Sequence, residues 1–142
     1  MASLLEKDNQ CGATAVEMAL ILPLLIILLF GIIEFCFIVY NKNIINNAAR
    51  EGARVGIVYE IPRKPSIEIQ QVVQNYLGNN LISFNPNAAT IPDPEICPSG
   101  TGTGQDLTVR IVYNYGFILL PNFISNLSGG IDLNSEATMK CE

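Results

Sequence analysis

The fold is decided by Gly12-Ala13-Thr14-Ala15-Val16-Glu17-Met18, which runs directly into Ala19-Leu20-Ile21-Leu22-Pro23-Leu24-Leu25-Ile26-Ile27-Leu28-Leu29-Phe30. No charged residue occurs from Met18 to Ile33. As a helix, the span Met18–Tyr40 would be roughly 35 Å long, enough to cross the hydrocarbon core of a bilayer. Glu17 at the edge of this span needs a physical reason, because a carboxylate is costly beside hydrocarbon.

The composition limits the classes of protein to which the chain can belong. Its 142 residues leave room for one small domain beyond a membrane segment, and 49% of them are hydrophobic. The net charge is −5 and no basic cluster is longer than Arg63-Lys64, so we expect no nucleic-acid binding. The chain has no histidine, the commonest general base and metal ligand. We therefore expect a protein that is not an enzyme and has no cofactor, metal site or catalytic residues.

A cleavable secretory signal fits the N-terminus poorly. The apolar run is too long for the hydrophobic part of such a signal, and no small-x-small cleavage site follows it. Tyr40-Asn41-Lys42-Asn43 follows instead. We expect the segment to remain in the mature protein.

The chain divides into three regions. Residues 1–12 form a short polar leader, and residues 13–59 form a long helix whose part 18–40 is transmembrane. The rest of that helix is amphipathic and rich in small residues. Gly52 and Gly56 weaken it, which favours an early end near Ala53.

Residues 60–142 are predicted to form a small α+β domain outside the cytoplasm. Ser66 is a suitable N-cap for a second helix, which ends at Gly78 or soon after. One face of this helix is apolar and consists of Ile69, Val72, Val73, Tyr76 and Leu77. Two later segments alternate apolar and polar residues with a period of two, which is typical of half-buried strands. Their apolar residues are Leu107, Val109, Ile111, Tyr113 and Tyr115, then Ile131, Leu133, Ala137, Met139 and Cys141. The predicted fold is therefore a long N-terminal helix followed by one helix packed on a short antiparallel sheet.

Glu34 is a second carboxylate in the apolar run, and two interpretations are open. It lies near the outer end of the span and reaches toward the interface, or it faces a protein partner. In the second case it would pair with a cation such as Lys42 or Arg50 of a neighbouring chain. The second interpretation makes Glu34 a candidate residue for subunit assembly.

Cys97 and Cys141 both lie in the predicted outer domain. A disulfide between them would close a loop of about 45 residues and add roughly 2–4 kcal/mol of stability. It would require an oxidising compartment. The alternative is two unpaired cysteines, one of them packed as a small hydrophobic residue.

Four pieces of the sequence, in this order and spacing, resemble the TadE-like family of pilin-like proteins from tight-adherence (Flp) type IV pilus systems. The pieces are Gly12-Ala13-Thr14-Ala15-Val16-Glu17-Met18-Ala19-Leu20, Leu22-Pro23-Leu24, Gly31-Ile32-Ile33-Glu34-Phe35 and Asn47-Ala48-Ala49-Arg50-Glu51-Gly52-Ala53-Arg54. The resemblance implies that a prepilin peptidase cuts after Gly12 and leaves Ala13 as the new N-terminus. It also implies that Glu17 pairs with the N-terminal ammonium of a neighbouring subunit, which offsets the cost of burying either charge. Met18 stands where fibre-forming Flp pilins carry an aromatic residue, so the chain is expected to be a minor pilin, or pseudopilin.

The resemblance also bears on topology and partners. Lys42, Arg50 and Arg54 follow the span, so the positive-inside rule alone would place the domain in the cytoplasm. Prepilins instead keep the leader in the cytoplasm, and we expect a single-pass protein of the bacterial inner membrane with its domain outside, in or beside a surface pilus used in adhesion. The expected partners are other pilin-like subunits, the pilus assembly machinery, the prepilin peptidase and membrane lipid. The alternative is an uncleaved membrane-anchored protein whose outer domain binds a protein partner.

Overall fold

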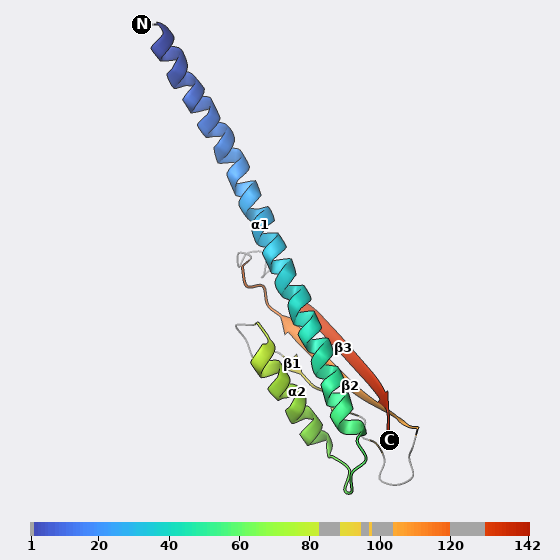
Figure 1. Cartoon of the computed structure of the whole chain (residues 1–142). Coiled ribbons are helices and arrows are strands. Elements are labelled where there is room, and N and C mark those ends of the chain that lie inside the picture. The colour runs from blue at the N-terminus through green and yellow to red at the C-terminus, as the bar shows by residue number, and fades with distance from the viewer. Residues whose placement is uncertain (1, 83–88, 95–96, 98–103, 120–129) are drawn as a thin grey trace.

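The structure is a computed structural model that describes residues 2–82, 89–94, 97, 104–119 and 130–142, with side chains from Gly12 onward. Within these residues, two helices precede three strands: α1 (Ala2–Ile57), α2 (Ser66–Asn80), β1 (Ala89–Thr90), β2 (Asp106–Tyr115) and β3 (Ile131–Lys140). Figure 1 shows α1 as one long rod whose second half lies in a small domain and whose first half extends away from it. The predicted α+β class is confirmed.

Helix α1 has 56 residues and is therefore about 84 Å long. It continues through Gly52 and Gly56 to Ile57, so the early end near Ala53 is wrong. The two glycines serve close packing: a Cβ at Gly52 would lie 2.5 Å from Val73 Cγ2, and a Cβ at Gly56 would lie 2.5 Å from Leu107 Cδ2. Their small size lets α1 approach both α2 and β2.

The N-cap of helix α2 is one residue earlier than expected. Pro65 occupies the N-cap position without a side-chain cap, and Ser66 is the first helical residue, so the Ser66 cap is wrong. Proline is well suited to the start of a helix because it has no N–H to leave unsatisfied. The predicted apolar face is confirmed where Ile69, Val73 and Leu77 are buried.

The three strands form one antiparallel sheet in the order β1-β2-β3. Strands β2 and β3 pair along their full length, from Asp106 opposite Lys140 to Tyr115 opposite Ile131. The alternation predicted for both strands is confirmed except at the beginning of β3, where Ile131 is exposed although it belongs to the predicted apolar face.

The core lies between this sheet and α1. The second half of α1 packs on β2 and β3, and α2 packs beside α1. The long helix is thus a core element of the domain as well as its N-terminal extension. The buried apolar residues are Ile45, Ala48, Ala49, Ala53, Ile69, Val73, Leu77, Cys97, Leu107, Val109, Ile111, Tyr113, Tyr115, Leu133, Ala137 and Cys141.

Candidate functional site

The first part of α1, residues 12–33, stands clear of the domain (Figure 1). We call this segment the free arm. Its large apolar side chains are exposed around the whole circumference, for example Leu20 at 75%, Leu24 at 71% and Ile27 at 63%. The helix is long and apolar enough to cross a membrane. An arm of this kind fits a single-pass membrane anchor, because exposing so much apolar surface to water is unfavourable.

The three residues expected to act in processing and assembly lie at the beginning of this arm. Gly12, Ala13 and Glu17 are all helical and exposed. A Cβ placed at Gly12 would have no neighbouring atom within 4 Å, in contrast to Gly52 and Gly56. Packing within the chain therefore does not explain the glycine at position 12. Glu17 makes no ion pair within the described part of the chain.

Glu34 is at the other end of the free arm, where α1 meets the domain, and its side chain is 2% exposed. Its Oε1 accepts hydrogen bonds from the Tyr115 hydroxyl at 2.5 Å and from the Ile118 N–H at 2.9 Å. Its Oε2 accepts one from the Leu119 N–H at 2.7 Å. Three donors from the end of β2 and the segment after it thus satisfy one buried carboxylate, as burial of a charge requires.

Tyr115 is held in place by its neighbours as well as by Glu34. Its ring packs edge-to-face against Tyr113 and Phe117, with centroids 6.4 and 6.2 Å away. Burial raises the pKa of the Tyr115 hydroxyl well above its usual value, and the hydrogen bond to the Glu34 carboxylate raises this pKa further. Tyr115 therefore remains a hydrogen-bond donor to Glu34 over the whole physiological pH range.

The expected part of Glu34 in subunit assembly stays a prediction, but its side chain is buried and does not reach outward from the chain. Its donors are a hydroxyl and backbone N–H groups of its own chain rather than Lys42 or Arg50. Lys42 donates instead to the backbone carbonyl of Asn134 on β3. The sequence contained no signal that Tyr115, 81 residues away, would return to Glu34.

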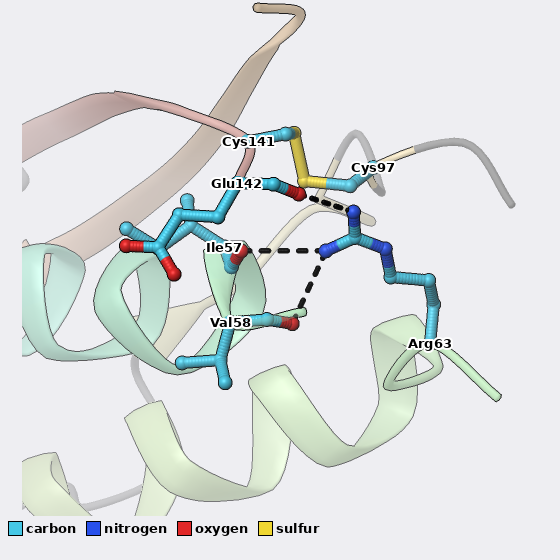
Figure 2. The surroundings of a disulfide bond; sticks show 6 residues. All are labelled: Ile57, Val58, Arg63, Cys97, Cys141 and Glu142. Carbon is cyan, nitrogen blue, oxygen red and sulfur yellow. Dashed lines mark hydrogen bonds between the residues drawn. A yellow bond between two sulfur atoms is a disulfide. The ribbon is translucent and has the colours of Figure 1, made fainter. Parts of the chain in front are cut away.

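The far end of the domain contains the second cluster of interactions, shown in Figure 2. Cys97 and Cys141 form a disulfide with a Cα–Cα distance of 5.9 Å, and these are the two cysteines paired in the sequence-based expectation. Arg63 donates to the carbonyls of Ile57 and Val58 at the end of α1 and to the carbonyl of Glu142. Arg63 thereby caps the C-terminus of α1, where cationic donors are favourable, and ties it to the segment that carries the disulfide.

Sequence reasoning missed Arg63 and Asn41 as structural residues. Asn41 is fully buried; its Nδ2 donates to the Ile82 carbonyl at 2.8 Å and its Oδ1 accepts from the Ile82 N–H at 3.0 Å. The position of Asn41 directly after the apolar run could have indicated that its amide is buried and hydrogen-bonded. Within the described residues, no group of three His, Cys, Asp or Glu side chains could hold a metal ion.

Residues 12–54 match the model of a protein family described as TadE-like protein. The match covers the free arm, Glu34 and the small-residue face of α1, and the predicted resemblance is confirmed over this segment. It indicates a pilin-like protein associated with a tight-adherence pilus, and it implies interaction with other pilus components. No curated protein and no solved structure matches the chain.

Proposed function

Since residues 12–54 carry the TadE-like segment, we propose that this protein is a minor pilin-like subunit, a pseudopilin, of a tight-adherence (Flp, type IV) pilus. The observation that carries the proposal is the free arm, which is apolar on all sides and has one exposed carboxylate, Glu17, near its beginning. A helix of this kind needs both a bilayer before assembly and apolar neighbours afterwards. The folded domain attached to its other end is consistent with a minor component.

In this proposal a prepilin peptidase cuts after Gly12 and makes Ala13 the new N-terminus. The open surroundings of Gly12 support the assignment, because the glycine there has no packing role that would otherwise explain it. Ala13 is exposed, so a new ammonium at this position would be free to meet a partner.

Glu17 then acts in assembly through its charge. It lies four residues after Ala13, about 6 Å along the helix axis. The ammonium of one subunit and the Glu17 carboxylate of the next offset each other's cost of leaving water and fix the axial register between the two helices. Glu34, which is occupied within its own chain, has no part in this contact.

We further propose that the protein lies in the bacterial inner membrane with its N-terminus in the cytoplasm and its domain outside. The Cys97–Cys141 disulfide supports this orientation, because disulfides persist in oxidising compartments. Alkaline phosphatase fused after Glu142 should be active and green fluorescent protein fused there should be dark. The reverse pattern would place the domain in the cytoplasm.

A count of free thiols, together with the intact mass, tests the processing step directly. The chain has four cysteines, and the disulfide uses two of them. Protein extracted from the membrane, denatured without reductant and treated with a maleimide should gain one label, at Cys36, because Cys11 is removed with the leader. Its mass should lack Met1–Gly12.

Two labels on a full-length mass would instead support the alternative, an uncleaved membrane-anchored protein whose outer domain binds a partner. A variant with Cys11→Ser serves as the control, since it should change the label count of uncleaved protein and leave that of cleaved protein unchanged. Three labels on the shortened chain would show that cleavage occurs without the disulfide.

A further inference from the structure

Two contacts along α1 bracket the level at which the hydrocarbon can end. At Glu34 the helix meets the end of β2 and residues 118 and 119. Six residues further, the Tyr40 hydroxyl donates to the Asn80 carbonyl at the end of α2. These levels are about 9 Å apart along the helix axis. Asn79 is exposed beside Asn80, so the hydrocarbon cannot extend to Tyr40 without taking unpaired amide groups out of water.

At the level of Glu34, by contrast, the polar backbone groups have partners within the chain. Residues 116–119 have irregular backbone there, which is tolerated near hydrocarbon only if its polar groups find partners. The N–H groups of Ile118 and Leu119 both donate to Glu34. The carboxylate thus supplies acceptors that water would otherwise have to supply.

Apolar side chains are exposed at this same level. Phe35 is 63% exposed, Leu119 37% and Ile131 38%. Phe35 follows Glu34 in α1, Leu119 donates its N–H to Glu34, and Ile131 lies opposite Tyr115 in the sheet register. We call these three residues the apolar shelf. The end of β2 and the beginning of β3 lie at the end of the domain from which the free arm extends (Figure 1).

We propose that the apolar shelf is seated in the interfacial layer of a phospholipid leaflet, so that the domain itself contacts lipid. The argument for lipid as the occupant is continuity: the shelf begins within two residues of the free arm, whose exposed apolar surface already requires a bilayer. With Glu17 and Glu34 at the two edges of the hydrocarbon, the uncharged residues Met18–Ile33 between them span about 24 Å, close to the roughly 30 Å thickness of the core. The span then ends near Glu34 rather than at Tyr40. This inference rests on the membrane anchor in the proposed function and is independent of the pilus.

Tryptophan fluorescence tests the shelf cleanly, because the chain contains no tryptophan. Leu119→Trp and Phe35→Trp place a reporter on the shelf, and two variants provide matched controls at exposed apolar positions. Leu28→Trp reports from the free arm, and Ile67→Trp reports from α2 at the far end of the domain, where the side chain is 56% exposed. The full chain is reconstituted into phosphatidylcholine vesicles whose acyl chains carry bromine, either near the glycerol or near the methyl end.

The two shelf reporters should lose most of their emission with bromine near the glycerol and less with bromine near the methyl end, and their emission should be blue-shifted. Leu28→Trp should be quenched and Ile67→Trp should not. If both shelf reporters behave like Ile67→Trp while Leu28→Trp is quenched, lipid does not cover the shelf and the proposal is overturned, with the anchor intact. If Leu28→Trp is also unquenched, the membrane anchor itself is wrong.

Discussion

The Tyr115 hydroxyl donates a 2.5 Å hydrogen bond to the Glu34 carboxylate and so joins the end of β2 to the base of the free arm. The two residues are 81 positions apart in the sequence. This bond and the two backbone N–H groups beside it attach the base of the free arm to the domain. The cluster is structural, and in the proposal above it also marks the level at which the membrane-spanning part of the helix ends.

Loss of the Glu34 carboxylate should destabilise the domain strongly. Glu34→Ala leaves one hydroxyl and two N–H groups without an acceptor, and we expect the free energy of unfolding to fall by about 3–5 kcal/mol. Tyr115→Phe removes one of three donors and should cost about 1–2 kcal/mol. Unfolding of the detergent-solubilised protein, followed by near-ultraviolet circular dichroism, measures both.

The matched control for this prediction is Glu51→Ala on the same helix. Glu51 is half-buried and has a 3.9 Å ion pair with Arg54. Its loss should change stability by less than about 1 kcal/mol. Equal costs for Glu34→Ala and Glu51→Ala would contradict the role assigned to the buried carboxylate.

Stability should fall at high pH because of Tyr115. Its pKa is raised in the folded state, so below the ordinary tyrosine value of 10.0 the hydroxyl is protonated in both states and its stabilising contribution is fully present. Above that value the unfolded chain releases the proton and the folded chain does not. Stability is therefore lost as pH rises, by up to about 1.4 kcal/mol per pH unit. Tyr115→Phe should show a shallower decline between pH 10 and 12, and parallel profiles for the two proteins would refute the assignment.

The close approach at Gly52 should make it intolerant of a methyl group. Gly52→Ala places a Cβ 2.5 Å from Val73 Cγ2, and valine is too stiff to move aside easily. We expect a net loss of about 1–3 kcal/mol despite the better helix propensity of alanine. Gly78→Ala in α2 is the control, because a Cβ there meets nothing within 4 Å. It should stabilise the domain by about 0.5–1 kcal/mol. The midpoints of thermal unfolding should therefore be lower than the wild type for Gly52→Ala and higher for Gly78→Ala, and the reverse order would contradict the packing role of Gly52.

Assembly should depend on the charge of Glu17. Glu17→Gln should leave the amount of protein in the membrane unchanged and reduce its cross-linking to other pilus subunits by about tenfold or more, because the neighbouring ammonium would be buried without a partner. Glu17→Asp should retain part of the cross-linking, since it keeps the charge. Glu51→Gln on the same helix should behave as the wild type. Undiminished cross-linking of Glu17→Gln would remove the basis for the proposed pairing.

Much of the fold could be predicted from local patterns. The period of two in β2 and β3 identified most of the buried residues, with Ile131 as an exception, and the apolar face of α2 was identified by its helical spacing. These patterns are reliable because burial of one face is a local requirement of each element. The same reasoning failed at Gly52 and Gly56, where helix propensity predicted an early end and tertiary packing overrode it.

The site could be predicted only in part, for a similar reason. The position of Glu34 was conspicuous because a carboxylate in an apolar run is unusual. Its partners were not predictable, since they depend on where β2 ends in space. A single sequence offers no pattern that connects residue 34 with residues 115, 118 and 119.

The packing of Ile45, Ala48, Ala49 and Ala53 of α1 into the core has a practical consequence for work on this protein. A soluble fragment that starts at Asn41, after the end of the apolar stretch, would lose the Glu34 acceptors. A fragment that starts at Glu60 would lose all of α1 and with it these four core residues. We expect neither to fold as the domain does in the full chain. A truncation intended for crystallisation should begin at or just before Glu34, even though this retains several residues that look like membrane sequence.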